Sequence, residues 1–236
     1  MYLFFDLGST LIDESLCDRQ SILDTVAGSA ITAKEYEDKL KEFAGKNENY
    51  YACARAYFDL PKVAWRHDLE RLYSGVSDIL ERLSAHYKLG VIANQQPGLW
   101  DRLKALGIDP FFSVIVGSGD VGLKKPDPAI FKEALAQAQC PPEQAVMIGD
   151  RLDNDILPAQ RLGMKTVWVR QGFGAYGEPE LLPKSPDYTI RNILELERLG
   201  FLPFTGTGAS HIQSQKVSIG AGFVPAWWEL YTKKLK

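Results

Sequence analysis

Near its amino end the chain reads YLFFDLGSTL, residues 2–11, in which four apolar residues stand directly before Asp6. The apolar run is continuous rather than alternating, a pattern typical of strands that are covered on both faces, as in a parallel sheet. Comparable runs recur further along the chain. They cover residues 88–93, 112–116, 145–148 and 166–169.

Helical patterns separate these runs, over residues 77–86, 97–106, 128–139 and 155–162. Alternating strands and helices predict an α/β fold with a Rossmann-like parallel sheet. Residues 13–75 interrupt the alternation without a strand-like run, and we interpret them as short helices, the last over 64–73. One of them begins at a capping box formed by Thr32 and Glu35.

This pattern predicts a core domain of residues 1–12 and 76–202 and a helical cap domain of residues 13–75, inserted after the first strand. Ligands of such sheets bind beyond the carboxyl ends of the strands, where the cap would act as a lid. Residues 203–236 form a C-terminal extension with a Gly/Ser/Thr-rich start and adjacent tryptophans, Trp227 and Trp228. The extension could pack on its own domain or hold a homodimer together.

Composition narrows the classes of function. The net charge of −3 gives no reason to expect a nucleic-acid surface. No apolar run approaches the ~20 residues that a membrane span needs. Cys17, Cys53 and Cys140 are odd in number and widely spaced, as in reduced intracellular proteins. We therefore expect a cytoplasmic protein whose partner is a small molecule, neither a nucleic acid nor a membrane.

Polar residues follow three of the apolar runs: Asp6, Asn94 and Asp150. The carboxyl ends of parallel strands converge at one edge of a sheet, where two carboxylates repel each other unless a cation separates them. Mg²⁺ is the hard, oxygen-preferring ion for such a site when phosphate is also bound. Lys125, in the segment GLKKPDP (residues 122–128), adds a positive charge for an anion.

Four segments resemble the motifs of the haloacid dehalogenase superfamily of hydrolases: DLGSTLID (6–13), GVIAN (90–94), GLKKPDP (122–128) and IGDRLDNDI (148–156). They occur in the family's order, and the resemblance spans residues 2 to about 200. The helical insert resembles the C1 cap of the subfamily that contains many small-metabolite phosphatases. The resemblance therefore implies a Mg²⁺-dependent hydrolase of a small phosphorylated metabolite.

The resemblance also implies roles for single residues. Asp6 would be the nucleophile that forms an aspartyl-phosphate. Asp6, the backbone carbonyl of Gly8 and Asp150 would hold Mg²⁺. Lys125 would neutralise phosphate charge and orient Asp6, and Asp155 would fix the loop behind the metal ligands.

Phosphate contacts are expected from Lys125, Asn94 and Ser9. The neighbouring Lys124 could compete for the role of Lys125, but the residue directly before the proline matches the family. Ser9 stands where the family usually has glycine. Its hydroxyl could donate to phosphate, although a turn serine that faces water is the more ordinary interpretation.

Gly8 departs from the family, whose first motif usually carries a second aspartate there as the acid and base. General acid–base help is worth ~10²–10⁴-fold in rate. Asp13 or Glu14 could supply a proton through water. Three hypotheses follow: a hydrolase restricted to good leaving groups such as acyl phosphates, a hydrolase of carbon–halogen or carbon–phosphorus bonds, or a binding protein for a phosphometabolite or partner without turnover. We favour the first.

Overall fold

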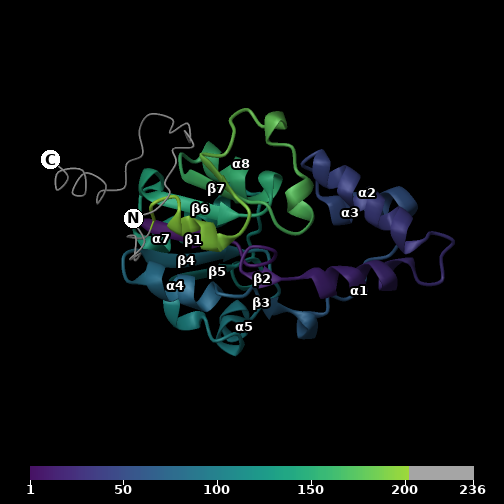
Figure 1. Cartoon of the computed structure of the whole chain (residues 1–236), viewed down its shortest axis with the longest axis horizontal. Helices are drawn as coiled ribbons and strands as arrows, with labels where there is room; N and C mark the ends of the chain where they lie inside the picture. The colour runs from purple at the N-terminus through teal and green to yellow at the C-terminus, as the bar shows by residue number, and fades with distance from the viewer. Residues whose placement is uncertain (202–236) are drawn as a thin grey trace, which may run out of the picture.

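A computed structural model describes residues 1–201, so the predicted C-terminal extension and its dimer contact lie outside the described residues. Six parallel strands form the central sheet in the order β5-β4-β1-β6-β7-β8 (Figure 1). Their bounds are Tyr2–Phe5 (β1), Lys88–Ala93 (β4), Phe112–Gly117 (β5), Ala145–Gly149 (β6), Lys165–Val169 (β7) and Tyr188–Ile190 (β8). The predicted α/β class and its first five strands are confirmed, and the edge strand β8 was not predicted.

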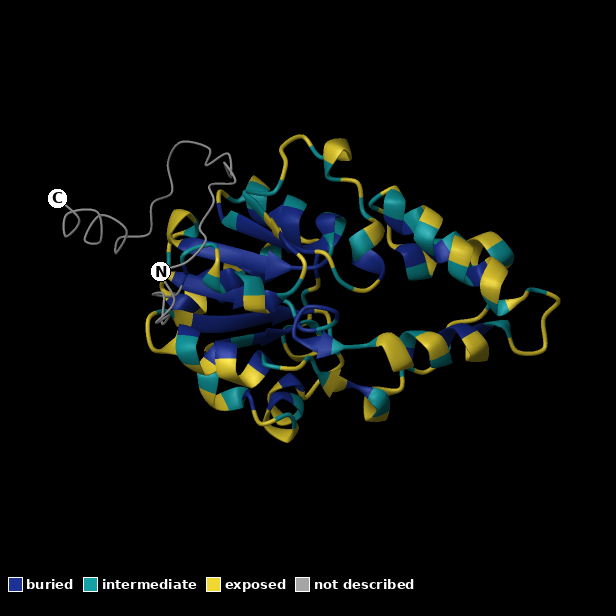
Figure 2. Cartoon of the chain, viewed as in Figure 1, coloured by how far each residue is buried: buried dark blue, intermediate teal, exposed yellow. Residues whose placement is uncertain are grey.

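Both faces of the sheet are covered, which explains the continuous apolar runs. Along β1, Leu3 and Phe5 point into one apolar cluster and Tyr2 and Phe4 into the other. The strands of the central sheet are accordingly coloured mostly as buried in Figure 2. Helices on the first face are α4 (Val76–Ser84) and α5 (Leu99–Ala105), together with the 3₁₀ turn Ile193–Glu197. The second face is covered by α7 (Pro128–Ala138) and α8 (Leu157–Arg161).

The insert contains three helices, α1 (Ser15–Val26), α2 (Ala33–Gly45) and α3 (Tyr50–Phe58). They pack on an apolar cluster of their own, around Tyr36, Leu40 and Ala54. Thr32 and Glu35 form the predicted capping box at the start of α2. Phe173, from the loop after β7, joins the same cluster and fixes the insert to the core.

Two features of the insert differ from prediction. Residues 64–73 do not form a helix, since a 3₁₀ turn at His67–Leu69 is followed by strand β3 (Arg71–Leu72). Strand β3 pairs antiparallel with β2 (Ile12–Asp13), in a stretch where no strand was expected. Pairing between segments that are far apart in sequence outweighs the weak local helical pattern here.

Short helical turns complete the described chain. The helix predicted over 155–162 begins instead as a π-helical turn at Leu152–Ile156, and α8 follows it. The remaining turns are α6 (Ser118–Val121), Asp109–Phe111, Pro142–Gln144, Phe173–Tyr176 and Pro179–Leu181. Within residues 1–201, none of the helices combines the length and apolar character needed to cross a membrane.

Candidate active site

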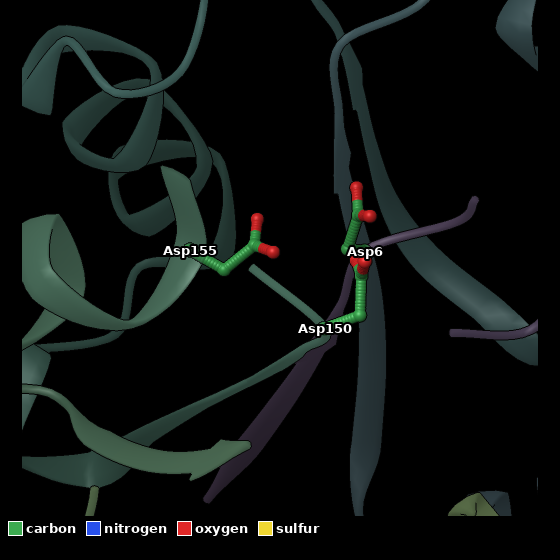
Figure 3. Close-up of side chains that lie close together, drawn as sticks. All are labelled: Asp6, Asp150 and Asp155. Atoms are coloured by element: carbon green, nitrogen blue, oxygen red, sulfur yellow. The ribbon is translucent and has the colours of Figure 1, made fainter. Parts of the chain in front are cut away.

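Three carboxyl groups meet at the carboxyl edge of the sheet. Asp6 directly follows β1 and Asp150 directly follows β6, while Asp155 projects from the π-helical turn (Figure 3). Strands β1 and β6 are neighbours, and the backbone N–H of Asp6 donates to the Ile148 carbonyl at 2.8 Å. One ligand oxygen from each aspartate lies within 4.8 Å of the others. The sheet topology therefore brings Asp6 and Asp150 together as the sequence predicted.

Lys125 bridges two of these three carboxyl groups. Its ammonium is 2.6 Å from Asp6 Oδ1 and 2.5 Å from Asp155 Oδ1, and the side chain is fully buried. Burial alone would lower the pKa of Lys125, but the charges of Asp155 and Asp6 outweigh it and raise the pKa above its usual value. The ammonium therefore stays charged and fixes the positions of two of the three carboxylates.

The acidic group still has an excess of negative charge. Burial raises the pKa of Asp150 well above its ordinary value, and the charges of Asp155 and Asp6 raise it further. Burial also raises the pKa of Asp155 to about 6, against the pull of Lys125. Three crowded carboxylates offer only oxygen ligands, which is the donor set that Mg²⁺ prefers. The residues present therefore fit a magnesium ion, with Asp6 and Asp150 as side-chain ligands.

Two glycines allow this close packing. A Cβ atom on Gly149 would lie 2.5 Å from Asp155 Oδ2, and one on Gly174 would lie 2.4 Å from the Asp150 carbonyl oxygen. Contacts this short between non-bonded atoms are not tolerated, so any larger residue would push the carboxylates apart. The loop after β7, which carries Gly174, thus forms part of the wall around Asp150.

Asn94 and Lys125 hold each other through reciprocal hydrogen bonds. The Lys125 N–H donates to Asn94 Oδ1 and Asn94 Nδ2 donates to the Lys125 carbonyl, both at 2.8 Å. Asn94 therefore positions the backbone of the lysine loop, and its expected phosphate contact stays a prediction. Lys124 is exposed and lies in the wall of a cavity beside the acids. Of the two lysines, Lys125 is the one in contact with Asp6.

Ser9 and Glu14 form a second polar contact beside Asp6. Ser9 is buried with φ of 51°, and its hydroxyl donates to Glu14 Oε2 at 3.2 Å. The alternative interpretation of Ser9 as a turn serine facing water is therefore wrong, because the turn directs the side chain inward. Burial and the negative charges of Asp18 and Asp6 raise the pKa of Glu14 to about 8. The expected phosphate contact of Ser9 and the metal contact of the Gly8 carbonyl stay predictions.

A cavity of about 370 Å³ opens next to this contact. Its walls include Glu14, Asn94 and Lys124, together with Lys62 and His67 from the insert. His67 Nδ1 lies 2.9 Å from Glu70 Oε1, and the buried Glu70 also forms an ion pair with Arg102 on α5. This network fixes the base of the insert to the core domain.

The sequence predicts the insert as a lid over this edge of the sheet but does not identify Lys62, Trp65 and His67 as residues of the cavity wall, because residues 64–73 have the pattern of a helix. The segment WRHDLE (65–70) is placed there by contacts that its sequence does not show, such as the ion pair of Glu70 with Arg102 on α5.

Comparison with known proteins gives a consistent assignment. Residues 3–169 match the family described as haloacid dehalogenase-like hydrolase. The chain is 32% identical over 218 residues to a glyceraldehyde 3-phosphate phosphatase of Pyrococcus furiosus, covering 82% of this chain and 90% of the relative. The same activity is named for a Methanocaldococcus jannaschii relative that is 32% identical over 223 residues, covering 82% of this chain and 94% of the relative. A solved haloacid dehalogenase-like hydrolase of Streptococcus pneumoniae superposes with a TM-score of 0.60 at 26% identity, covering 84% of this chain and 97% of that one.

Proposed function

The chain belongs to the haloacid dehalogenase-like hydrolases and is a phosphatase-type enzyme, and from this premise we propose that it hydrolyses the phosphate ester of a small metabolite through an aspartyl-phosphate on Asp6. Mg²⁺ is the proposed cofactor. Relatives named for glyceraldehyde 3-phosphate make that ester the first substrate to test. A cavity of about 370 Å³ is at the lower end of the sizes that hold small ligands.

The observation that carries the proposal is the contact of one buried ammonium with two carboxylates beside a third. In the first half of the reaction, an Asp6 carboxylate oxygen attacks phosphorus and the bond to the leaving oxygen breaks. Lys125 holds Asp6 at 2.6 Å and supplies positive charge next to the phosphoryl oxygens. Water then attacks phosphorus, the bond to Asp6 breaks, and phosphate and the free carboxylate are released.

Asp6 and Asp150, with the predicted help of the Gly8 carbonyl, would hold the magnesium ion. When bound there, the ion would neutralise phosphoryl charge and separate the two carboxylates. Asp155 keeps its contacts to Lys125 and to the backbone N–H of Arg151, at 2.5 and 3.0 Å. These contacts support its predicted role of fixing the loop that carries Asp150.

The test is a screen of small phosphate esters and acyl phosphates with Mg²⁺, run in parallel with Asp6→Asn. We expect turnover in the unmodified protein, none above background in the variant, and a phosphorylated Asp6 in rapidly quenched samples by mass spectrometry. The matched control is Asp153→Asn, since Asp153 lies in the same loop but pairs with Arg151. Binding of Mg²⁺ and phosphate without any Asp6-dependent turnover would instead favour the binding-protein hypothesis.

A further inference from the structure

Gly8 and Glu14 compete for the same space. A Cβ atom built on Gly8 would lie 2.4 Å from Glu14 Oε2 and 2.7 Å from its carboxyl carbon. The carboxyl group of Glu14 therefore occupies the volume in which a side chain at position 8 would begin. Only a residue without a side chain fits at position 8 while Glu14 keeps this position.

The local fold directs Glu14 toward this space. Glu14 directly precedes α1, but its side chain reaches back to Gly8 and accepts the Ser9 hydroxyl at 3.2 Å. The carboxylate of its neighbour Asp13 is used differently, since it accepts the Ser15 N–H at 2.9 Å, while the Asp13 backbone lies opposite Arg71 in the small sheet. Of the two acids considered from sequence, the geometry therefore favours Glu14.

Glu14 also lines the cavity beside the site, whose wall includes Asn94, the residue that holds the Lys125 backbone. Among the residues that the structure describes around the 370 Å³ cavity, Glu14 is the one with a carboxyl group. The other acids near Asp6 are already engaged, because Asp155 pairs with Lys125 and Asp150 is a proposed metal ligand. An alkoxide leaving from a phosphate ester needs a proton, and the water that later attacks must lose one.

We propose that Glu14 is the general acid and base of the reaction, supplying from the start of α1 the carboxyl group that position 8 lacks. This inference rests on the proposed phosphatase function. As the phosphorus–oxygen bond to the leaving group breaks, the Glu14 carboxyl gives its proton to that oxygen and the alcohol departs. The resulting carboxylate then takes a proton from water as water attacks the aspartyl-phosphate, which restores Asp6 and releases phosphate.

The first test is Glu14→Gln, which keeps the shape of the side chain and removes the transferable proton. For glyceraldehyde 3-phosphate, whose alkoxide is a poor leaving group, we expect kcat/KM to fall ~10²–10⁴-fold. For p-nitrophenyl phosphate, which needs no acid, the first burst of p-nitrophenolate should stay within a few-fold of the unmodified rate. Steady-state turnover should slow and phosphorylated Asp6 should accumulate, because water is no longer deprotonated.

The matched control is Asp13→Asn, for which both substrates should keep their rates. Loss of the p-nitrophenolate burst in folded Glu14→Gln would assign Glu14 a structural role and overturn the inference. So would equal rates of Glu14→Gln and unmodified protein on both substrates. Failure of the proposed function would look different, since the unmodified protein would then show no Asp6-dependent turnover at all.

A reciprocal exchange tests the shared space directly. Glu14→Ala should lose activity on glyceraldehyde 3-phosphate, and adding Gly8→Asp to it should recover at least about tenfold, because the carboxyl group then returns from position 8 to vacated space. Gly8→Asp alone should not show such a gain, since the new side chain collides with Glu14. A folded double variant without recovery would contradict the inference.

Discussion

The active site combines two groups of sequestered acids that are stabilised in different ways. At the edge of the sheet, Asp6 and Asp155 share the Lys125 ammonium. At the start of the insert, Glu14 and Asp18 instead accept hydrogen bonds from hydroxyl groups, those of Ser9 and Tyr51. A cation favours the ionised form of a carboxyl group, whereas burial without a cation favours the protonated form.

The difference suggests a division of labour. The group at the edge of the sheet, which we call the core group, consists of Asp6, Asp150, Asp155 and Lys125. It combines one ammonium with three carboxylates that suit a divalent ion, so its acids act in their ionised form. Burial is the largest influence on Asp155 in the core group and on Asp18 in the group at the insert, and it raises the pKa of both alike to about 6, but Lys125 opposes it at Asp155. At Glu14, burial and the negative charges of Asp18 and Asp6 act in the same direction and raise the pKa to about 8, so Glu14 is the acid that keeps its proton at neutral pH. Separating the two tasks keeps the proton donor apart from the ammonium that would otherwise stabilise its ionised form.

The largest expected effect comes from removing the shared cation in the core group. Lys125→Ala leaves Asp6 and Asp155 without their ammonium in a buried site, a change that typically costs about 3–5 kcal/mol of unfolding free energy. Loss of positive charge at the phosphoryl group should also lower kcat by ~10²–10³-fold. Urea denaturation and steady-state kinetics measure the two effects.

Lys124→Ala is the matched control, because Lys124 is the adjacent lysine but is exposed. It should stay within about 0.5 kcal/mol of the unmodified protein in stability and keep its kcat, with any effect of its place in the cavity wall confined to KM. Equal losses of stability and kcat in the two variants would show that the contact with Asp6 and Asp155 is not what makes Lys125 important.

The approach of Asp6 and Asp150 in the core group could be predicted from the sequence, because it depends only on where the parallel strands end. Continuous apolar runs gave the parallel strands, and parallel strands place their last residues at one edge, so Asp6 and Asp150 had to approach each other. Lys125 followed from its motif. The motif could not show that Asn94 would use its side-chain amide on the Lys125 backbone, because that depends on the conformation of two loops.

The group at the insert could be predicted only in outline. Helices α2 and α3 begin at side-chain caps, Thr32 and Asn49, which are local signals, whereas Glu14 at the start of α1 forms no such cap. Strand β3 and the position of Glu14 depend on contacts between segments far apart in sequence, such as the backbone pairing of β3 with β2. In the sequence, Gly8 indicates only that an acid is missing from position 8. In the structure, the absence of a side chain at Gly8 leaves the space that the Glu14 carboxyl group occupies.

A smaller effect is expected where the loop after β7 contacts the core group. Gly174→Ala places a Cβ atom 2.4 Å from the Asp150 carbonyl oxygen, and backbone must move to relieve the contact. Overpacking of this kind usually costs about 1–3 kcal/mol. We expect a lower melting temperature and, because Asp150 shifts, weaker Mg²⁺ binding by calorimetry.

Gly45→Ala provides the control for that substitution. Gly45 is the last residue of α2, and its Cβ atom would make only an ordinary contact at 3.6 Å with the Tyr176 carbonyl oxygen. Alanine favours helix over glycine by up to about 1 kcal/mol, so this variant should be neutral or slightly more stable. If Gly45→Ala lost as much stability as Gly174→Ala, the loss would come from replacing any glycine and not from the contact of residue 174 with Asp150.

The last prediction concerns the pH dependence of stability at Asp18. Burial raises its pKa from 3.8 to about 6, so the folded state binds the proton more tightly than the unfolded chain does. Stability at this site is therefore greatest below pH 4, falls as pH rises toward 6, and is lowest above pH 6, by at most ~3 kcal/mol. Asp18→Asn cannot ionise, so it should be more stable than the unmodified protein at pH 8 by about 1–3 kcal/mol, with little gain at pH 4.

Urea denaturation at the two pH values measures this difference, and Asp24→Asn is the matched control. Asp24 lies on the same helix, is exposed and accepts a hydrogen bond from Gln20, so its replacement should stay within about 0.5 kcal/mol at both pH values. A gain for Asp18→Asn that is equal at pH 4 and pH 8 would show that ionisation is not its source. A gain in stability of Asp18→Asn that is confined to pH 8 would show that the ionised Asp18 carboxylate, beside Glu14 and Tyr51, destabilises the folded insert.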